Sequence, residues 1–479
     1  MLFNSLQFAI FFPMVVALYF SLPHRHRVLM LLVASCVFYM AFIPAYILIL
    51  FVTIGIDYFA GIYLEKYEGH ARRVLLILSI ISTCAVLFVF KYFDFFTDNF
   101  IGLANLLGWK LTNPVVHIIL PIGLSFHTFQ SLSYVIEVYR RKQRAETNFV
   151  TYATYVMFFP QLVAGPIERP QNLLHQFNQI HSFDYERIAG GLKRMAWGLY
   201  KKVVVADRLA LYVNDVYAAP QSFNGLQLTL ATIFFAYQIY CDFSGYSDIA
   251  LGSAQVLGFK LMENFNTPYY SASVGEFWRR WHISLSTWFR DYLYFPLGGS
   301  RVPKWRWVLI ILITFGVSGL WHGANWTYVI WGLVNAMYLI VGDFTRDIRR
   351  RIYGFVGIGE TSFLRRGIGI GVTFALTLCA WVFFRAKTPV DAWYVLMHWP
   401  SNWDFGMIKT QHFQLKHLPV AFAAIIGLEV VQLIQPRVLF NISIPKLPGA
   451  LRWATYLLFV FAVILFGVYR KTQFIYFQF

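Results

Sequence analysis

The sequence predicts an all-α protein that crosses a membrane many times. Of its 479 residues, 58% are hydrophobic and only 13% are charged, whereas a soluble chain of this length carries roughly 25% charged residues. The hydrophobic residues gather in runs, and a helix of roughly 20 residues crosses a hydrocarbon core about 30 Å thick. We expect about ten to thirteen membrane segments, some too short to cross alone, on runs that include 6–20, 28–43, 46–64, 74–90, 225–240, 307–320, 326–342, 368–384, 418–434 and 454–469.

The basic residues favour one orientation of these segments. The net charge of +17 would suggest a nucleic-acid partner in a soluble protein, but here Lys and Arg lie in short loops, as the positive-inside bias requires. The first apolar stretch has no Lys or Arg before it and is followed by Arg25 and Arg27. We therefore predict an uncleaved first helix with its amino end outside. The loop expected after 74–90, with Asp94 and Asp98, then lies on the outer side.

The middle of the chain departs from this simple alternation. Residues 149–171 hold Pro160, Gly165, Pro166 and Pro170, a spacing that disfavours a straight helix, so a half-span or a re-entrant loop is expected. Residues 181–217 mix charged and apolar residues in a pattern typical of a helix lying in the membrane interface. Because no soluble domain or repeat is visible, we expect one membrane domain over 1–479, made of amino-terminal helices 1–145, a catalytic core 146–345 and carboxy-terminal helices 346–479.

The segment EFWRRWHISLSTWFRDYLYFPLGG, residues 276–299, carries the first histidine of interest. A helix over 278–292 would place its tryptophans on one face and Arg279, His282 and Arg290 on another. Such a helix suits a membrane–water boundary, where the tryptophans would be structural anchors. Arg279 and Arg290 are candidate ligands for an anionic donor, because guanidinium binds phosphate oxygens in a bidentate way; a purely topological role is the alternative. For His282, a functional and a structural role are equally open.

The segment GLWHGANW, residues 319–326, carries the second histidine. About 24 Å of helix would separate Arg306, on the inner side, from His322, and the helix 326–342 then returns to basic residues, so His322 lies within the hydrocarbon depth. Imidazole exchanges a proton near neutral pH, and a titratable group at this depth needs a partner or a function. A core histidine hydrogen-bonded between helices is the alternative. Small neighbours allow close backbone approach, namely Gly316, Gly319 and Gly323.

A third polar cluster is YQIYCDFSGYSD, residues 237–248. Buried carboxylates need partners, so Asp242 and Asp248 would either orient a histidine or tie helices together, and we favour the second role. Asp242 is also a candidate substrate-binding residue. The four cysteines have no metal or redox spacing, so we expect no metal site. The chain also lacks the phosphate-loop, His-Glu-x-x-His and Gly-x-Ser-x-Gly signatures of ATPases, metalloproteases and serine hydrolases.

Seven ordered motifs resemble the membrane-bound O-acyltransferase family, in its bacterial branch of alginate O-acetylation (AlgI-like) proteins. They are PIGLSFHTFQ (121–130), FFPQLVAGPIERP (158–170), GLYKKVVVADRLA (198–210), YQIYCDFSGYSDIALG (237–252), EFWRRWHISLSTWFRDYLYFPLGG (276–299), SGLWHGANWTYVIWG (318–332) and WVFFRA (381–386). The family's catalytic histidine matches His322, and its second, often polar, position matches His282. The chain departs from many relatives at Asn335-Ala336, where they carry His-Gly, and at His127, where they often carry Tyr.

The resemblance implies a ring of about 11 membrane helices, with re-entrant and interfacial pieces, around a central funnel or tunnel in the bacterial inner membrane. It implies an O-acetyltransferase in which His322 is the general base and His282 assists, either directly or through an acyl-histidine. The donor would be a thioester from the cytoplasm, acetyl-CoA or an acyl carrier protein, with no bound cofactor. The acceptor would be the hydroxyl of an exopolysaccharide, reached through a periplasmic partner. A transporter of the acyl donor, or a structural subunit of an export complex, is the alternative.

Overall fold

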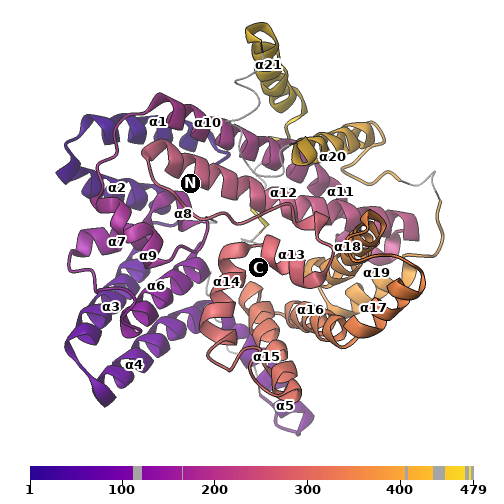
Figure 1. The fold of residues 1–479 in the computed structure, drawn as a ribbon, viewed down its shortest axis with the longest axis horizontal. Coiled ribbons are helices and arrows are strands. Elements are labelled where there is room, and N and C mark those ends of the chain that lie inside the picture. The colour runs from indigo at the N-terminus through magenta and orange to yellow at the C-terminus, as the bar shows by residue number, and fades with distance from the viewer. Residues whose placement is uncertain (112–120, 164, 405–407, 435–447, 470–473, 476–479) are drawn as a thin grey trace. The chain divides into compact units, whose positions relative to one another are not determined.

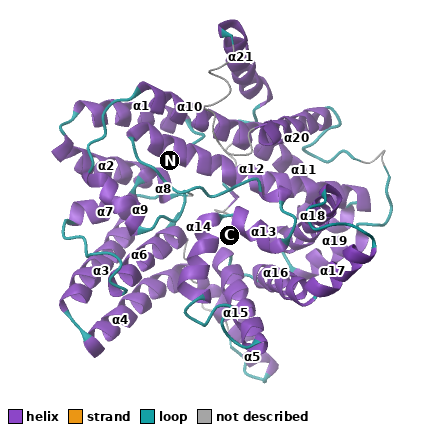
Figure 2. Cartoon of the chain, viewed as in Figure 1, coloured by secondary structure: helices purple, strands orange, loops and turns teal. Residues whose placement is uncertain are grey.

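The computed structural model describes residues 1–111, 121–163, 165–404, 408–434, 448–469 and 474–475. Over these ranges the chain forms helices and loops and no strand, as Figures 1 and 2 show. The predicted all-α class is therefore confirmed. The contacts divide the chain into two compact units, of which unit 1 is Met1–Met195 with Ile249–Met262, and unit 2 is Ala196–Asp248 with Glu263–Phe479. The expectation of a single domain, with boundaries at 145 and 345, stays a prediction.

Unit 1 is built from the amino-terminal helices. They are α1 (Leu6–Ser21), α2 (His24–Met40), α3 (Tyr46–Lys66), α4 (Gly69–Leu87), η1 (Phe88–Tyr92), α5 (Phe93–Leu106), α6 (Leu124–Tyr139), α7 (Phe149–Met157), α8 (Phe159–Leu162), α9 (Pro170–Leu173) and η2 (Leu174–Asn178). Two longer helices, α10 (Tyr185–Leu199) and α12 (Gly225–Leu257), contribute residues to both units.

Unit 2 holds both histidine motifs. Its other helices are η3 (Tyr200–Ala206), α11 (Asp207–Ala218), η4 (Pro220–Ser222), η5 (Pro268–Tyr270), α13 (Val274–Arg280), α14 (Ile283–Phe289), η6 (Arg290–Tyr294), α15 (Lys304–His322), α16 (Trp326–Phe344), α17 (Arg346–Phe355), α18 (Phe363–Arg385), α19 (Pro389–His398), α20 (His417–Ile434) and α21 (Gly449–Phe466).

Seven helical stretches in the described residues are long and apolar enough to cross a membrane: α3, the continuous α4–η1–α5, α15, α16, α18, α20 and α21. A polytopic membrane protein is thus confirmed. The count is below the predicted eleven because several expected spans form shorter helices, such as α2 with 17 residues and α6 with 16. The prediction of a loop after residue 90 is wrong, because Asp94 and Asp98 lie on helix α5.

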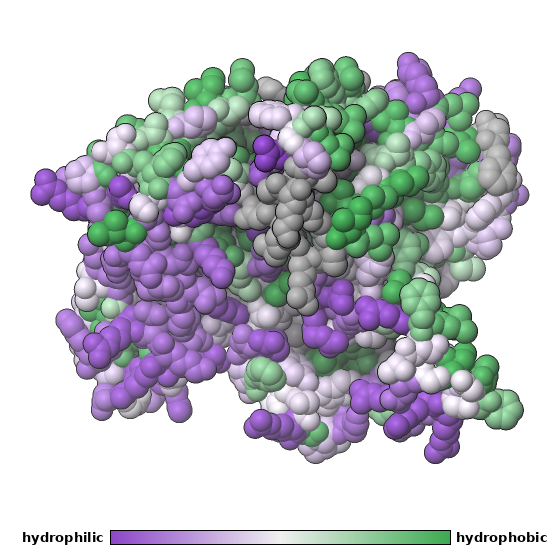
Figure 3. Space-filling model, turned by 45° about the horizontal axis from the view of Figure 1, so that its top comes forward, coloured by the Kyte–Doolittle hydropathy of each residue, from purple (hydrophilic) through white to green (hydrophobic). Residues whose placement is uncertain are grey.

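Large apolar side chains remain exposed on the membrane helices. Examples are Leu48, Val52 and Phe59 on α3, and Leu458 and Ile464 on α21. Figure 3 shows broad areas of hydrophobic side chains on one face, beside areas of hydrophilic side chains. Apolar patches of this extent on a protein surface mark contact with lipid or with another protein.

The predicted break in residues 149–171 is confirmed, because the segment forms three short helices, α7, α8 and α9. Pro160 lies in the first turn of α8, and Pro170 lies in the first turn of α9. The interfacial helix predicted for 181–217 is only partly correct. The chain is helical there, but Lys201 and Lys202 are 5% and 1% exposed. The second half of this segment is therefore a buried element of unit 2.

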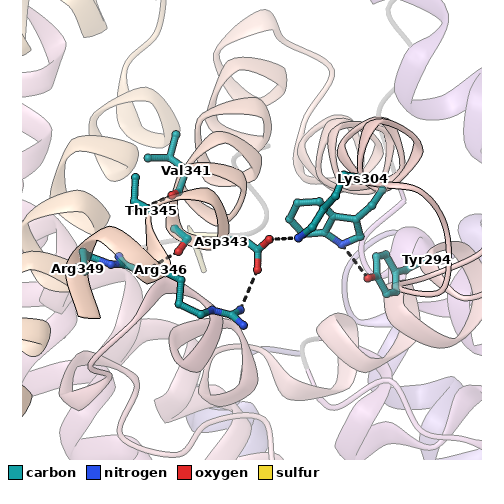
Figure 4. A network of polar contacts seen from close by, with 9 residues as sticks. Tyr294, Lys304, Val341, Asp343, Thr345, Arg346 and Arg349 are labelled. Carbon is teal, nitrogen blue, oxygen red and sulfur yellow. Dashed lines mark hydrogen bonds and ion pairs between the residues drawn. The ribbon is translucent and has the colours of Figure 1, made fainter. Parts of the chain in front are cut away.

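Helices α15 and α16 form a close antiparallel pair that carries His322 at one end. At the other end, Lys304 of α15 forms an ion pair with Asp343 of α16, which also binds Arg346 at 2.8 Å (Figure 4). Exposed ion pairs of this kind contribute only about 0–1 kcal/mol. Small residues matter more, because a Cβ at Gly319 would lie 2.2 Å from the Tyr328 carbonyl oxygen, and one at Gly332 would lie 2.2 Å from the Phe315 carbonyl oxygen.

We expect Gly332→Ala to destabilise the protein by about 1–3 kcal/mol, because the added methyl would meet backbone atoms that can move only by separating the two helices. Thermal unfolding of the purified protein in detergent measures the effect. Gly342→Ala is the matched control, since it lies on the same helix and a Cβ there has no neighbour within 4 Å. Equal unfolding temperatures for the two variants would contradict the close packing.

Candidate active site

His322 is the last residue of α15 and is 4% exposed. Its imidazole makes edge-on contacts with aromatic rings at centroid distances of 4.9 Å to Trp321, 5.0 Å to Trp331 and 5.4 Å to Phe384. The helix ends there, and Asn325 caps α16 through a hydrogen bond from the Thr327 backbone N–H. The α15–α16 turn thus holds the ring inside an aromatic wall in the interior of the protein.

His282 lies between α13 and α14 in the left-handed backbone region, with φ 43° and ψ 57°. The prediction of one helix over 278–292 is therefore wrong. Two long-range hydrogen bonds break it, one from Asn266 N to Arg280 O and one from Ile283 N to Asn264 O, both at 2.9 Å. A residue other than glycine in this region costs about 1–3 kcal/mol and persists where the surroundings enforce it, often at functional sites.

Both histidines belong to one buried group of side chains, here called the histidine cluster: His282, His322, Phe243, Trp321, Trp331 and Phe384. The Trp321 ring joins them, with centroids 6.2 Å from His282 and 4.9 Å from His322. Phe243 of α12 closes the other side of His282 with an edge-on contact at 4.5 Å. The structure thus brings together two imidazoles that are forty residues apart in the sequence.

Two of the three tryptophans in the first motif are buried in the protein and are not the interfacial anchors that the helical pattern suggested. Trp281 is 1% exposed and Trp288 is 7% exposed. Trp281 packs against Trp381 at 5.0 Å, and Trp381 stacks on Trp331 at 5.9 Å with an interplanar angle of 12°. These rings form the packed layer behind the histidine cluster, so they fix its shape.

A buried charge network, missed by sequence reasoning, adjoins the cluster on α12. Lys202 Nζ lies 2.6 Å from Asp242 Oδ1 and 2.9 Å from Asp207 Oδ1, and Lys201 forms an ion pair with Asp248. Asp242 and Asp248 therefore tie helices together, as favoured from the sequence. The consecutive lysines inside the apolar motif GLYKKVVVADRLA were the available signal.

The carboxy-terminal residues of unit 2 reach the same network. Asp242 Oδ2 accepts a hydrogen bond of 2.7 Å from the Ile475 backbone N–H. The Phe474 ring lies 4.3 Å from Tyr246 and 6.0 Å from Phe243, which contacts His282. Asp242 is thus connected to His282 through Phe474 and Phe243, and its role toward a substrate stays a prediction.

A model of the family described as MBOAT, membrane-bound O-acyltransferase, matches residues 72–380. The chain belongs to this family. It is similar to the probable alginate O-acetylase AlgI of Pseudomonas aeruginosa, with 39% identity over 418 residues that cover 85% of this chain and 77% of the relative. It is 34% identical to the peptidoglycan O-acetyltransferase of Helicobacter pylori over 417 residues, which cover 81% and 75% of the two chains. It is 26% identical to the teichoic acid D-alanyltransferase of Streptococcus thermophilus over 292 residues, which cover 57% and 70%.

In this membrane-bound O-acyltransferase, the described contacts of Arg279 and Arg290 do not include the histidine cluster. Arg279 is exposed, and Arg290 pairs with the neighbouring Asp291 at 2.8 Å. Their role toward an anionic donor stays a prediction. The two departures from the motif pattern lie in buried positions, His127 at 2% exposed on α6 and Asn335 at 4% exposed on α16, where its side chain donates to Trp331 O at 2.8 Å.

Burial in aromatic surroundings lowers the pKa of His282 to about 3, from an ordinary value of 6.5. His282 lies outside the seven apolar spans, and it is a neutral imidazole over the physiological range. Between pH 6.5 and about 3 the unfolded chain binds a proton at this residue and the folded chain does not. The folded protein therefore loses stability as pH falls through this window.

We expect His282→Asn to fold, because Asn adopts the left-handed region readily, and to flatten the decline of unfolding temperature between pH 6.5 and 4. Thermal unfolding at several pH values checks this, with His70→Asn, which removes an exposed imidazole on α4, as the control. A decline in His282→Asn as steep as in the unaltered protein would show that other groups dominate.

Proposed function

We propose that this acyltransferase moves an acetyl group from a thioester donor to a hydroxyl of an alginate-like exopolysaccharide, with His322 as general base. The observation that carries the proposal is the joining of His282 and His322 by the Trp321 ring. The similarity to an alginate O-acetylase and to a peptidoglycan O-acetyltransferase supports an acetyl group and a cell-envelope polymer. We further propose that the protein lies in the inner membrane with its amino terminus outside, and that a periplasmic partner completes transfer to the polysaccharide.

The chemistry needs one group that accepts and returns a proton. The His322 imidazole takes the hydroxyl proton as the oxygen attacks the thioester carbonyl, a contribution of roughly 10²–10⁴-fold. A tetrahedral oxyanion forms, then the carbon–sulfur bond breaks. The departing thiolate takes the proton from the imidazolium, so the products are an ester and a free thiol. In the alternative with an acyl-histidine at His322, the acetyl group passes first from the thiol to the imidazole and then from the imidazole to the hydroxyl.

His282 suits the role of oxyanion donor in this proposal. A neutral imidazole carries one N–H donor, and burial keeps His282 neutral. The left-handed backbone, held by the hydrogen bonds of Asn264 and Asn266, fixes its ring before substrate arrives. Fixed donors in surroundings of low polarity stabilise developing charge more strongly than donors in water.

The aromatic wall supports the same role for His322. Edge-on contacts with Trp331 and Phe384 restrict rotation of the imidazole and exclude bulk water. An oriented base holds the reacting atoms near their transition-state geometry, which removes part of the entropic barrier. Indole and phenyl rings also offer no nucleophile that would compete for the acyl group.

Purified protein in lipid vesicles tests the function. Acetyl-CoA labelled in the acetyl group is supplied on one side and an oligosaccharide of alginate type on the other, and formation of labelled acetyl ester is measured. A second arm replaces acetyl-CoA with an acetylated acyl carrier protein. Ester that depends on the protein supports the enzyme. Label that crosses the bilayer still attached to its carrier, with no ester, would instead support the transporter, and neither outcome in any arm would support a structural subunit.

A further inference from the structure

Unit 1 contains a carboxylate that the proposed chemistry does not use. Asp57 lies on the membrane helix α3 and is 0% exposed. Its Oδ1 accepts hydrogen bonds from Ser79 Oγ at 2.9 Å and from Thr83 Oγ1 at 3.0 Å, both on α4. Thr83 Oγ1 is also 3.3 Å from Oδ2. Two hydroxyl protons directed at one oxygen favour the ionised carboxylate.

No positive group balances this charge within the part of the chain that the structure describes. Asp57 makes no ion pair there, and its hydrogen-bond partners are hydroxyl groups. Arg72 is a buried basic residue on α4, but its guanidinium does not pair with Asp57. It donates hydrogen bonds to the carbonyl oxygens of Val138 and Tyr139, both at 2.9 Å. An ionised carboxylate in a membrane interior costs several kcal/mol unless a cation compensates it.

Two further hydroxyl groups lie beside Asp57 on other helices. Ser131 of α6 and Tyr152 of α7 are both 0% exposed, and the Asp57 charge acts on Tyr152. The Ser131 hydroxyl is a hydrogen-bond partner of the Asp57 carboxylate, and the Tyr152 hydroxyl is a hydrogen-bond partner of Ser131. A hydroxyl that donates its proton to a carboxylate or to another hydroxyl keeps its oxygen lone pairs, which can bind a cation.

Packing holds these oxygens in place. The Tyr152 ring lies 4.5 Å from Tyr134 and 5.8 Å from Tyr58. Tyr134 can approach because α3 has a glycine opposite it, where a Cβ at Gly61 would lie 2.7 Å from the Tyr134 ring. Helix α3 packs against α4, α6 and α7, and α6 packs against α4 and α7, so hydroxyl groups from three helices lie around one buried point, the Asp57 carboxylate.

We propose that this point binds one sodium ion, held by Asp57, Ser79, Thr83, Ser131 and Tyr152. Carboxylate and hydroxyl oxygens are ligands for hard cations, and the absence of imidazole and thiol disfavours transition metals. A single carboxylate matches a single positive charge. The ion would join α3, α4, α6 and α7, so it stabilises unit 1 independently of acyl transfer in unit 2.

The test is thermal unfolding of the full chain in detergent, in sodium chloride and in choline chloride at equal ionic strength, together with binding of radioactive sodium. We expect the unfolding temperature to rise with sodium and about one ion to bind per chain. Asp57→Asn removes the charge and keeps the shape, so it should lose both responses. Ser131→Ala should shift the sodium titration to several-fold higher concentration. Asp94→Asn, an exposed carboxylate of the same α4–η1–α5 helix, should behave as the unaltered protein does.

Several outcomes would overturn the site. One is an unaltered protein that unfolds equally in both salts and binds no sodium, because the carboxyl would then be protonated. Another is a sodium response that Asp57→Asn retains, since the effect would then come from elsewhere. If Asp57→Asn does not fold, the sodium titration of the unaltered protein is compared with that of Ser131→Ala. Equal sodium dependence of the two unfolding temperatures would then overturn the site.

Discussion

Acetyl transfer is expected to fall by roughly 10²–10⁴-fold in His322→Ala. The loss follows from the general base, because no other imidazole in the histidine cluster is placed to replace it: His282 stands beyond the Trp321 ring. Initial rates of ester formation in vesicles, at saturating donor, measure the effect. Binding of donor should be kept, since the ring is proposed to act on the hydroxyl.

The matched control is His398→Ala. This residue ends α19, and its ring stacks on Tyr394 at 3.9 Å, outside the histidine cluster. The substitution removes a half-buried imidazole with an aromatic neighbour, and it should leave the rate of ester formation unchanged. A well-folded His322→Ala with normal ester formation would remove His322 from the chemistry and favour transport or a structural role.

Lys202→Met is expected to destabilise the protein by about 3–5 kcal/mol, the usual effect of removing one partner from a buried ion pair. The change leaves the carboxylates of Asp242 and Asp207, 3% and 2% exposed, without the shared ammonium group. Unfolding temperature in detergent measures it. Rates should fall as well, because Asp242 holds the Ile475 backbone and, through Phe474 and Phe243, the wall beside His282.

Two comparisons separate charge from packing in this prediction. Adding Asp242→Asn to Lys202→Met should restore part of the stability, because one uncompensated carboxylate is removed. Lys66→Met, at the exposed end of α3, should have almost no effect. A single variant Lys202→Met that unfolds within a degree or two of the unaltered protein would mean that water, and not buried protein, surrounds the network.

Local sequence signals predicted the helical spans well. The apolar runs 307–320 and 326–342 correspond to α15 and α16. Proline and glycine spacing predicted the broken segment that became α7, α8 and α9. These features depend on residues close in the sequence, so a pattern reveals them.

Features set by distant residues could not be predicted. Periodicity continued one helix through His282, whereas backbone atoms of Asn264 and Asn266 break it. Lys202 resembled a surface residue because its partner Asp242 lies forty positions away. The contact of Phe474 and Ile475 with α12 has no local pattern at all. The sequence therefore predicted the two histidines separately, but it did not predict that both lie in one buried cluster of side chains.

The wide turn η3 (Tyr200–Ala206) between α10 and α11 has a consequence of its own. A π turn holds one more residue than an α turn, and each residue rotates a helix by about 100°. Deleting one residue there would wind the backbone tighter and swing the whole of α10 around its axis relative to α11. The additional residue therefore sets the direction in which Lys201 and Lys202 leave the helix toward their carboxylate partners.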